Sequence, residues 1–445
     1  ISDTLGKDEK MANPAFCAEV GDDVIVKCWK ALSRIREGIA LIGSDETAWD
    51  AFCFMNRVML LQRNIMSFSK KHAVNKECNL GDFVDPRKPE NDFGWRPFQI
   101  AFILMNLNGI VNPQHEDREV VDLLYFPTGG GKTEAYLGLM AFVIANRRLR
   151  ASENDEYNRD GGVTAILRYT LRLLTTQQRD RITKMVIAAE MVREKTAPKY
   201  GTEPISIGFW VGGGVTPNNF EELKDSPDNP GEAARKRRLI YKQLLACPFC
   251  GTELEENNFE IDHDRKSVFI YCSDPNCIFH KYRGRKAIPV YLVDEEIYAR
   301  CPTIILSTVD KFARLPWDVS TNTLFGRVDR RCDRHGYVAI GDNHSRHTRT
   351  RELEASTLTP VRPFLPPELI IQDELHLITG PLGTIYGAYE TIIEDMCTWG
   401  DQKIKPKYVV STATIRNAAA QAKCLYARKP VSYTHLRAHE TTLHL

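Results

Sequence analysis

Residues 126–133 read FPTGGGKT, and these residue types suit the binding of a nucleotide's phosphates. Glycines let the backbone approach an anion closely, because a Cβ would block that approach. A turn of this kind between a strand and a helix points N–H groups and the positive helix end at the phosphates. We predict that Lys132 contacts the β- and γ-phosphates of ATP and that Thr133 binds Mg²⁺. The predicted phosphate-binding residues are Thr128, Gly129, Gly130, Gly131, Lys132, Thr133 and Glu134.

The segment 373–376 reads DELH and follows the apolar run 369–372. One carboxylate at the end of a buried strand can bind Mg²⁺, and its neighbour can deprotonate the attacking water. We therefore predict that Asp373 is the magnesium residue and Glu374 the general base. Together with Lys132 they form the predicted catalytic set.

The segment 411–414 reads STAT and also follows an apolar run. Its hydroxyls can hydrogen-bond the acidic pair and relay the state of the nucleotide. We expect Ser411, Thr412 and Thr414 to couple to His376. The alternative is an ordinary turn that caps the next helix.

Residues 95–99, WRPFQ, lie upstream of the glycine-rich loop. A glutamine amide can read the donor and acceptor edge of adenine, and an aromatic ring can stack on its face. We predict that Gln99 reads the base, with Phe98 or Trp95 as the platform. The alternative is a helix start with aromatic core residues.

Two further segments, 168–178 and 307–311, carry hydroxyls, amides and basic groups after predicted strands. Such groups suit contacts to nucleic-acid phosphates, which position a strand without reading its sequence. Structural capping competes for each residue. The candidate contacts are Thr170, Arg172, Gln177, Thr308 and Lys311.

Four cysteines have the spacing of zinc ligands: Cys247, Cys250, Cys272 and Cys277. Two close pairs of thiolates suit a tetrahedral structural Zn²⁺ that folds a small module. A second group, Cys332 and His335 with His344 and His347, is either a metal site or an ordinary polar loop. The basic runs 235–238 and 281–286 are either nucleic-acid contacts or solvated surface.

Apolar runs and helical periodicity indicate which elements position these residues. We predict strands at 120–126, 163–167, 205–211, 303–307, 369–372 and 407–411, and helices at 134–148, 175–195 and 416–427. This alternation predicts an α/β fold with a parallel sheet and helices on both faces. Residues 1–90 read as a helical N-terminal region, and 91–429 as the nucleotide-binding domain. Insertions are expected at 213–300, which holds the zinc cysteines, and at 315–367.

The chain has 445 residues, 12 cysteines and a formal net charge of +1. Any nucleic-acid surface must therefore be local. The apolar runs are too short to span a membrane. The cysteine usage fits a reducing, cytoplasmic setting. The first residues show no signal-peptide pattern and no initiator Met, which indicates a chain cut at its front. Residues 430–445, including VSYTHLRAHET, resemble a translated sequencing adapter, and we expect this tail to be non-native.

The motifs occur in the order WRPFQ, PTGGGKT, RYTLRLLTTQQ, STVDKFARL, DELH and STATI. Over residues 95–429 this order resembles the first RecA-like (P-loop NTPase) domain of a superfamily 2 helicase of the DEAD/DEAH type. The run LIIQDELHLITGPLGTIYGAYE and the cysteine module resemble the large helicase component of bacterial DISARM anti-phage systems.

The resemblance implies ATP-driven movement on nucleic acid, with DNA favoured over RNA, and protein partners that include a methyltransferase and other defence components. The alternative is an ATP-gated DNA-binding switch or scaffold that loads partners without processive unwinding. Such enzymes also need a second RecA-like domain, which supplies an arginine to the γ-phosphate. We expect the chain by itself to bind ATP weakly and to hydrolyse it poorly.

Overall fold

The computed structural model describes residues 14–83, 94–125, 131–169, 176–227, 230–282, 286–350, 353–378, 380–412 and 418–432. Their centre is a parallel sheet in which eight strands are described. In sheet order these strands are β13 (Pro430–Ser432), β1 (Val121–Tyr125), β12 (Lys407–Thr412), β11 (Leu369–Gln372), β2 (Ala165–Tyr169), β7 (Ile304–Thr308), β3 (Ile207–Trp210) and β6 (Val290–Tyr291).

All six predicted strands are present in this sheet, within a few residues of their predicted bounds. The two edge strands, β6 and β13, were not predicted because two or three residues give no readable periodicity. β13 begins at Pro430, where the adapter-like tail was expected to start, yet it pairs with β1. Residues 433–445 lie outside the described residues.

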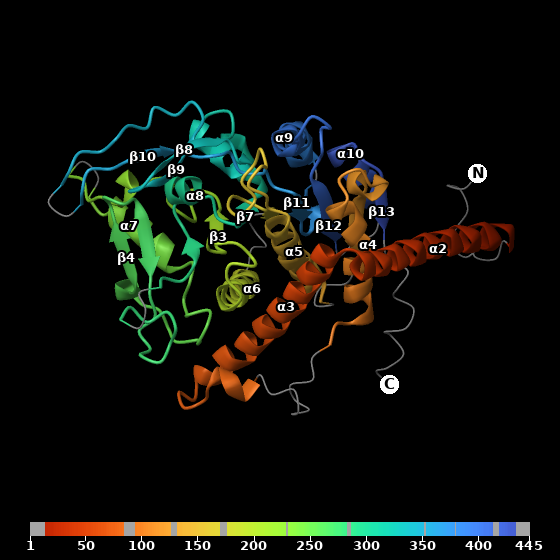
Figure 1. Ribbon diagram of the computed structural model, residues 1–445, viewed down its shortest axis with the longest axis horizontal. Coiled ribbons are helices and arrows are strands. Elements are labelled where there is room, and N and C mark those ends of the chain that lie inside the picture. Colours follow the sequence, from red (N-terminus) through yellow and green to blue (C-terminus); the bar gives the residue numbers. More distant parts are fainter. Residues whose placement is uncertain are drawn as a thin grey trace.

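Helices cover both faces of the sheet, as predicted (Figure 1). Successive strand residues alternate between two cores: Leu369 and Ile371 of β11 join one, and Ile370 joins the other. On the first face lie α3 (Glu46–His72), α4 (Pro97–Val111), α5 (Lys132–Leu149) and α6 (Thr176–Lys195). On the second face lie α8 (Asp294–Arg300), α9 (Gly380–Cys397) and α10 (Ala418–Tyr426).

The N-terminal helices are packed against the sheet domain. α2 (Pro14–Ser44) and α3 are the two long helices at the red end of the chain in Figure 1. Buried side chains of α3 join the same core as α5 and α6. Arg34 of α2 forms ion pairs of 2.7 Å with both Asp117 and Asp122, and Asp122 lies in β1. Burial of these charges in pairs joins α2 to the edge of the sheet.

Both predicted insertions contain structure of their own. The first holds α7 (Glu232–Tyr241) and a hairpin of β4 (Phe259–Asp262) with β5 (Ser267–Ile270). Its expected end at residue 300 was too late, because β6 and α8 already belong to the main sheet and its cover. The second forms an antiparallel sheet of β8 (Val328–Cys332), β9 (Gly336–Ala339) and β10 (Leu358–Pro360).

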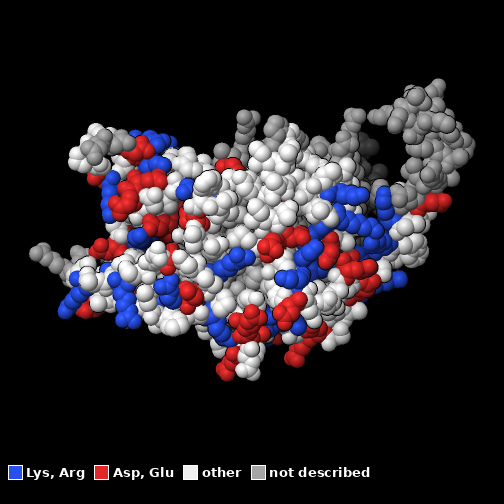
Figure 2. All heavy atoms as spheres, turned by 90° about the horizontal axis from the view of Figure 1, so that it is seen from above, with Lys and Arg blue, Asp and Glu red and all other residues white. Residues whose placement is uncertain are grey.

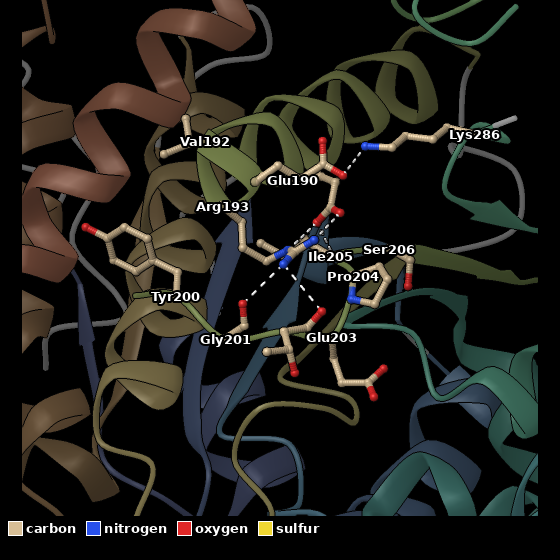
Figure 3. Close-up of polar contacts among 12 residues, drawn as sticks. Glu190, Val192, Arg193, Tyr200, Gly201, Glu203, Pro204, Ile205, Ser206 and Lys286 are labelled. Atoms are coloured by element: carbon tan, nitrogen blue, oxygen red, sulfur yellow. Dashed lines mark hydrogen bonds and ion pairs between the residues drawn. The ribbon is translucent and has the colours of Figure 1, made fainter. Parts of the chain in front are cut away.

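The end of α6 is tied to the segment that leads into β3 (Figure 3). Arg193 donates to the Gly201 carbonyl at 3.1 Å and pairs with Glu190 at 2.6 Å. Glu190 in turn accepts from the Ile205 backbone N–H at 2.8 Å. A cavity of about 1070 Å³ opens beside this junction, lined in part by α6 and β5. Among the described residues, neither Lys132 nor the acidic pair lines this cavity.

Basic and acidic side chains are interspersed on the face shown in Figure 2, and the upper middle of this face is mostly uncharged. This distribution agrees with the net charge of +1. Among the described residues, no helix has the length and apolar content needed to cross a membrane.

Candidate nucleotide site

The strand that precedes the predicted phosphate loop and the strand that precedes the acidic pair lie in one parallel sheet, separated by a single strand. β12 lies between β1 and β11, so it separates the strand before the loop from the strand before the acidic pair. In this register Ser411 pairs with Leu124, and Val410 pairs with Gln372. The hydroxyls of β12 therefore lie between the two motifs. The carboxyl edge of a parallel sheet is also where ligands of open α/β folds bind.

Gly131 begins the helix that follows the loop. It is the N-cap of α5 with φ of 89°, a left-handed conformation that favours glycine. A Cβ at this position would lie 2.9 Å from the Gln99 amide nitrogen. The backbone conformation therefore favours glycine, and a Cβ would also displace the Gln99 amide. The other predicted loop residues, Thr128, Gly129 and Gly130, lie outside the described residues.

Lys132 is the first residue of α5 and its side chain is buried. Its Nζ has no hydrogen-bond partner among the described residues. It forms a long ion pair with Glu374 Oε1, at 3.8 Å. A buried ammonium without a hydrogen bond is costly, and an anionic oxygen that accepts from it would reduce that cost. This cation at a helix N-terminus fits a phosphate group, which supports the predicted role of Lys132.

Asp373 accepts three hydrogen bonds, from β12, from α5 and from the next residue of the chain. Its Oδ1 accepts from the Ser411 hydroxyl of β12 and, at 2.9 Å, from the Glu374 backbone N–H. Its Oδ2 accepts from the Tyr136 hydroxyl of α5 at 2.8 Å. The structure thus brings Ser411 to the acidic pair, as the sequence predicted. A carboxylate oriented in this way suits the binding of a divalent cation.

Tyr136 links the two predicted magnesium residues, and sequence reasoning missed it. Its hydroxyl lies 3.2 Å from Thr133 Oγ1 and 2.8 Å from Asp373 Oδ2. Tyr169 of β2 contacts the same hydroxyl at 2.9 Å. Burial, together with the Asp373 charge, raises the pKa of Tyr136 well above its usual value, so this phenol remains a donor. Its spacing of three residues from Thr133 on one helix was the available signal.

We expect Tyr136→Phe to weaken Mg²⁺-dependent ATP hydrolysis by about 10- to 100-fold, the range for losing a hydrogen bond to a charged group. The substitution keeps the ring, so the fold should be retained. Titrating Mg²⁺ in the hydrolysis assay should show a higher requirement for the cation. Tyr169→Phe is the matched control and should lose less. Equal Mg²⁺ curves for wild type and Tyr136→Phe would contradict the proposed link.

Glu374 is the predicted general base. It has φ of 51°, a left-handed conformation that is strained for this residue type and that frequently occurs at functional sites. Its Oε2 makes no hydrogen bond among the described residues. Burial, and then the neighbouring Asp373 charge, raise the pKa of Glu374 above its usual value. A raised pKa makes a carboxylate a better proton acceptor.

His376 contacts both motifs that it was expected to couple. Its Nδ1 lies 3.4 Å from Glu374 Oε2 and 3.3 Å from Thr412 Oγ1. Gln421 of α10 donates to the Leu375 carbonyl at 3.1 Å and thereby supports the short helical turn of the DELH segment. Sequence reasoning did not identify Gln421. Thr414 lies outside the described residues.

The predicted adenine residues are engaged inside the chain. Gln99 donates to the Gly131 carbonyl at 2.8 Å and accepts from the Arg96 backbone N–H at 2.9 Å. Phe98 is a buried core residue, and Trp95 donates to Asn56 Oδ1 at 2.8 Å. These contacts show Gln99 supporting the phosphate loop. They favour the alternative of a helix start with core aromatics for the two rings.

The nucleic-acid candidates differ in their exposure. Gln177 is exposed on α6, whereas Thr308 is fully buried. Lys311 is also buried, and its Nζ lies 2.5 Å from Asp294 Oδ2. The expectation that Thr308 and Lys311 present themselves to a nucleic-acid strand therefore needs correction: both side chains are packed inside the domain. Thr170 and Arg172 lie outside the described residues.

Arg168 lies in the segment 168–178, which was predicted to contact nucleic acid, but no role was predicted for Arg168 itself. Its guanidinium pairs with Glu390 of α9 at 2.9 Å, and both side chains are buried. Burial alone would lower the pKa of Arg168, but the Glu390 carboxylate and the surrounding tyrosine hydroxyls together raise it above its usual value. Tyr408 donates to the same carboxylate at 2.6 Å. The network fastens α9 to β2 and β12 directly behind the acidic pair.

The four zinc cysteines converge as predicted. Their sulfur atoms all lie within 4.8 Å of one another, with 3.5 Å between Cys250 and Cys272 and 3.8 Å between Cys247 and Cys277. A tetrahedral zinc with bonds of about 2.3 Å would place its sulfurs about 3.8 Å apart. The backbone N–H of Asp274 also points at a sulfur, at 3.4 Å. These residues therefore fit a structural Zn²⁺.

The cysteine module is docked on α3 and does not stand alone. Phe249 packs edge-on against Phe68 of α3 with ring centroids 5.5 Å apart. His72, the last residue of α3, contacts Asp274 at 2.8 Å. A Cβ at Gly251 would lie 2.2 Å from the Ser69 carbonyl oxygen. The module therefore joins the main core, which its sequence spacing did not predict.

The basic runs are largely neutralised by acidic neighbours. In α7, Arg235 pairs with Glu232 at 2.5 Å and Arg237 pairs with Asp225 at 3.0 Å. In the second run, Lys281 pairs with Glu260 at 2.8 Å. Of the two alternatives left open by the sequence, these pairs favour a solvated surface.

Comparison with known proteins gives one close relative. No family model matches the chain. The sequence is 48% identical over 431 residues to the DISARM protein DrmA of Bacillus paralicheniformis. The aligned region covers 95% of this chain and 37% of that protein. The chain is homologous to DrmA and spans little more than a third of its length.

Solved structures of the DUF1998 helicase MrfA are among those that match. The form bound to DNA has a TM-score of 0.34 at 12% identity and covers 76% of this chain and 27% of that chain. The form bound to DNA and AMPPNP has a TM-score of 0.32 at 12% identity and covers 73% of this chain and 26% of that chain. TM-scores of this size do not establish a shared fold.

Proposed function

We propose that this chain is the ATP-binding unit of a superfamily 2 helicase or translocase that acts on nucleic acid, with DNA favoured. The observation that carries the proposal is the buried Lys132 ammonium, which makes no hydrogen bond among the described residues and lies 3.8 Å from Glu374, beside an Asp373 already oriented by three hydrogen bonds. A cation for phosphate, a carboxylate for Mg²⁺ and a base for water are the parts that ATP hydrolysis requires.

The roles of the residues follow from their positions. Lys132 would bind the β- and γ-phosphates, and Thr133 and Asp373 would hold Mg²⁺, whose chemistry is to neutralise charge on the phosphates. Glu374 would accept the proton of the attacking water. His376 and Thr412 would pass the state of the site to β12, because His376 contacts both Glu374 and Thr412.

Homology to DrmA supports a place for the longer protein in a DISARM system, and hence a role in anti-phage defence. The protein partners implied by that resemblance, including a methyltransferase, belong to the same proposal. The DISARM setting is also what favours DNA over RNA as the nucleic acid. The MrfA structures add no argument, since their similarity to this chain is too low.

A second function is an ATP-gated DNA-binding switch that loads partner proteins without moving along the strand. Because Thr308 and Lys311 are buried, the DNA contacts of either function would come from other residues. Both functions use the same ATP site. The difference therefore lies in movement and not in hydrolysis.

The test uses a chain extended to the length of the DrmA relative. We expect DNA-stimulated ATP hydrolysis together with either strand displacement or triplex displacement. ATP-dependent DNA binding without either displacement would replace the motor by the switch. ATP hydrolysis that is indifferent to DNA and RNA would reject both functions.

A further inference from the structure

A second group of metal-ligating side chains lies in the insertion that forms β8, β9 and β10. One ligand atom from each of Cys332, His335, His344 and His347 can be chosen so that all lie within 4.8 Å of one another. The first two residues lie at the turn between β8 and β9, and the other two in the loop that follows β9. The chain thus brings two separate segments to one point.

The orientation of His335 points to an occupant at that position. Its Nε2 lies 3.0 Å from the Asp264 carbonyl oxygen, so this nitrogen carries the proton and donates. Its Nδ1 is then a free lone pair, and it is buried without a hydrogen-bond partner among the described residues. Metal-bound histidines almost always donate their other ring N–H to a carbonyl or carboxylate in this way.

The two loop histidines face the same point. Their Nε2 atoms lie 3.2 Å apart. Two imidazoles on a tetrahedral zinc, with bonds of about 2.05 Å, would place these nitrogens about 3.3 Å apart. The ring centroid of His335 lies 5.3 Å from that of His344 and 4.4 Å from that of His347. A hydrogen bond between two histidines explains neither the third ring nor the thiol.

We propose that Cys332, His335, His344 and His347 bind a second divalent transition-metal ion, with Zn²⁺ as the fitting choice. One thiolate and three imidazoles complete a tetrahedron, so the site is closed and structural. On binding, the Cys332 thiol releases its proton to solvent, and each histidine binds as the neutral imidazole. The proposal is independent of the proposed ATP site.

A metal ion at this site would fix the position of the polar loop that follows β9. Residues 341–350 are exposed or half-exposed, and the loop contributes little to either main core. Its fastening is mostly polar, as where the His347 N–H donates to Ser356 Oγ at 2.6 Å. Segments with too little apolar burial often depend on a metal for their order. The metal would hold Arg346 and Arg349 at the surface in a defined arrangement.

The first measurement counts metal in the whole chain. After saturation with Zn²⁺ and gel filtration, elemental analysis should give two equivalents for wild type. His344→Ala/His347→Ala should retain one, and Cys247→Ser/Cys250→Ser should lose the other. Ser345→Ala/Arg346→Ala changes the same loop without touching a ligand, so it should keep both. One equivalent in wild type, unchanged by the histidine substitutions, would overturn the proposal.

Two further readouts keep the test informative if the double histidine variant folds poorly. His347→Cys preserves a ligand and should keep two equivalents. With Co²⁺ in place of Zn²⁺, it should add thiolate charge-transfer absorption relative to wild type. Trypsin should cut at Arg346 and Arg349 faster after chelation than in the metal-loaded chain. Unchanged cobalt spectra and unchanged cleavage would count against the site.

Discussion

Glu374→Gln is expected to reduce ATP hydrolysis by about 10²- to 10⁴-fold, the usual contribution of a general base, while ATP binding persists. The amide keeps the size of the side chain but cannot accept the proton of the attacking water. Because the carboxylate is already buried with a raised pKa, its neutral isostere should not disturb the fold. Hydrolysis is measured in the chain extended to the DrmA length, and binding by calorimetry.

Lys132→Ala, in contrast to Glu374→Gln, should weaken the binding of ATP itself. Removing one charged hydrogen bond costs about 1.5–3 kcal/mol, which corresponds to roughly a 10- to 100-fold weaker Kd. The exposed residues Glu153 and Lys70 supply matched controls, Glu153→Gln and Lys70→Ala, which should leave both quantities unchanged. Unaltered hydrolysis in Glu374→Gln would remove Glu374 from the proposed role. Unaltered ATP affinity in Lys132→Ala would remove the phosphate site.

Arg168→Met is expected to destabilise the fold by about 3–5 kcal/mol, because it leaves the Glu390 carboxylate buried without its partner. For a domain of this size that corresponds to a fall in Tm of about 4–7 °C. The pair is buried on both sides, with side-chain exposures of 0% and 3%. Circular dichroism melting measures the shift.

A double substitution separates the lost pair from the lost packing. Arg168→Met/Glu390→Gln removes both charges, and glutamine can still accept from Tyr408. We expect the double variant to be more stable than Arg168→Met, since no buried charge remains unpaired. The half-exposed pair of Arg159 with Asp155 gives the matched control, Arg159→Met, which should cost less than about 1 kcal/mol. A Tm of Arg168→Met equal to wild type would show that the pair contributes nothing to stability.

The elements that could be predicted are those whose signal is local. The apolar runs before the loop and before DELH became β1 and β11 because a strand buried on both faces is predominantly apolar. α9 was not predicted, although its bounds cover 18 residues. Its first residues include glycine and proline, which normally signal a turn. Its packing against Arg168 and Tyr408 comes from elements far away in the chain.

The residues of the site also divide into those with a local sequence signal and those without one. Lys132 and the zinc cysteines were readable because their chemistry depends on spacing over a few residues. Tyr136 was not, because its role depends on β11 ending above the first turns of α5. Lys311 was misread for the same reason: a lysine after a strand resembles a surface contact until α8 places Asp294 beside it.

By itself, the sequence determined which chemical groups are present and which short loops present them. The glycine loop, the acidic pair and the cysteine pairs follow from backbone conformation and ligand spacing, which act over short distances. The tertiary structure decided how these groups meet. The order β1–β12–β11 brings Ser411 to Asp373, and the β8–β9 turn brings Cys332 to the loop histidines. Strand order and burial depend on packing between distant segments, and no local pattern records that packing.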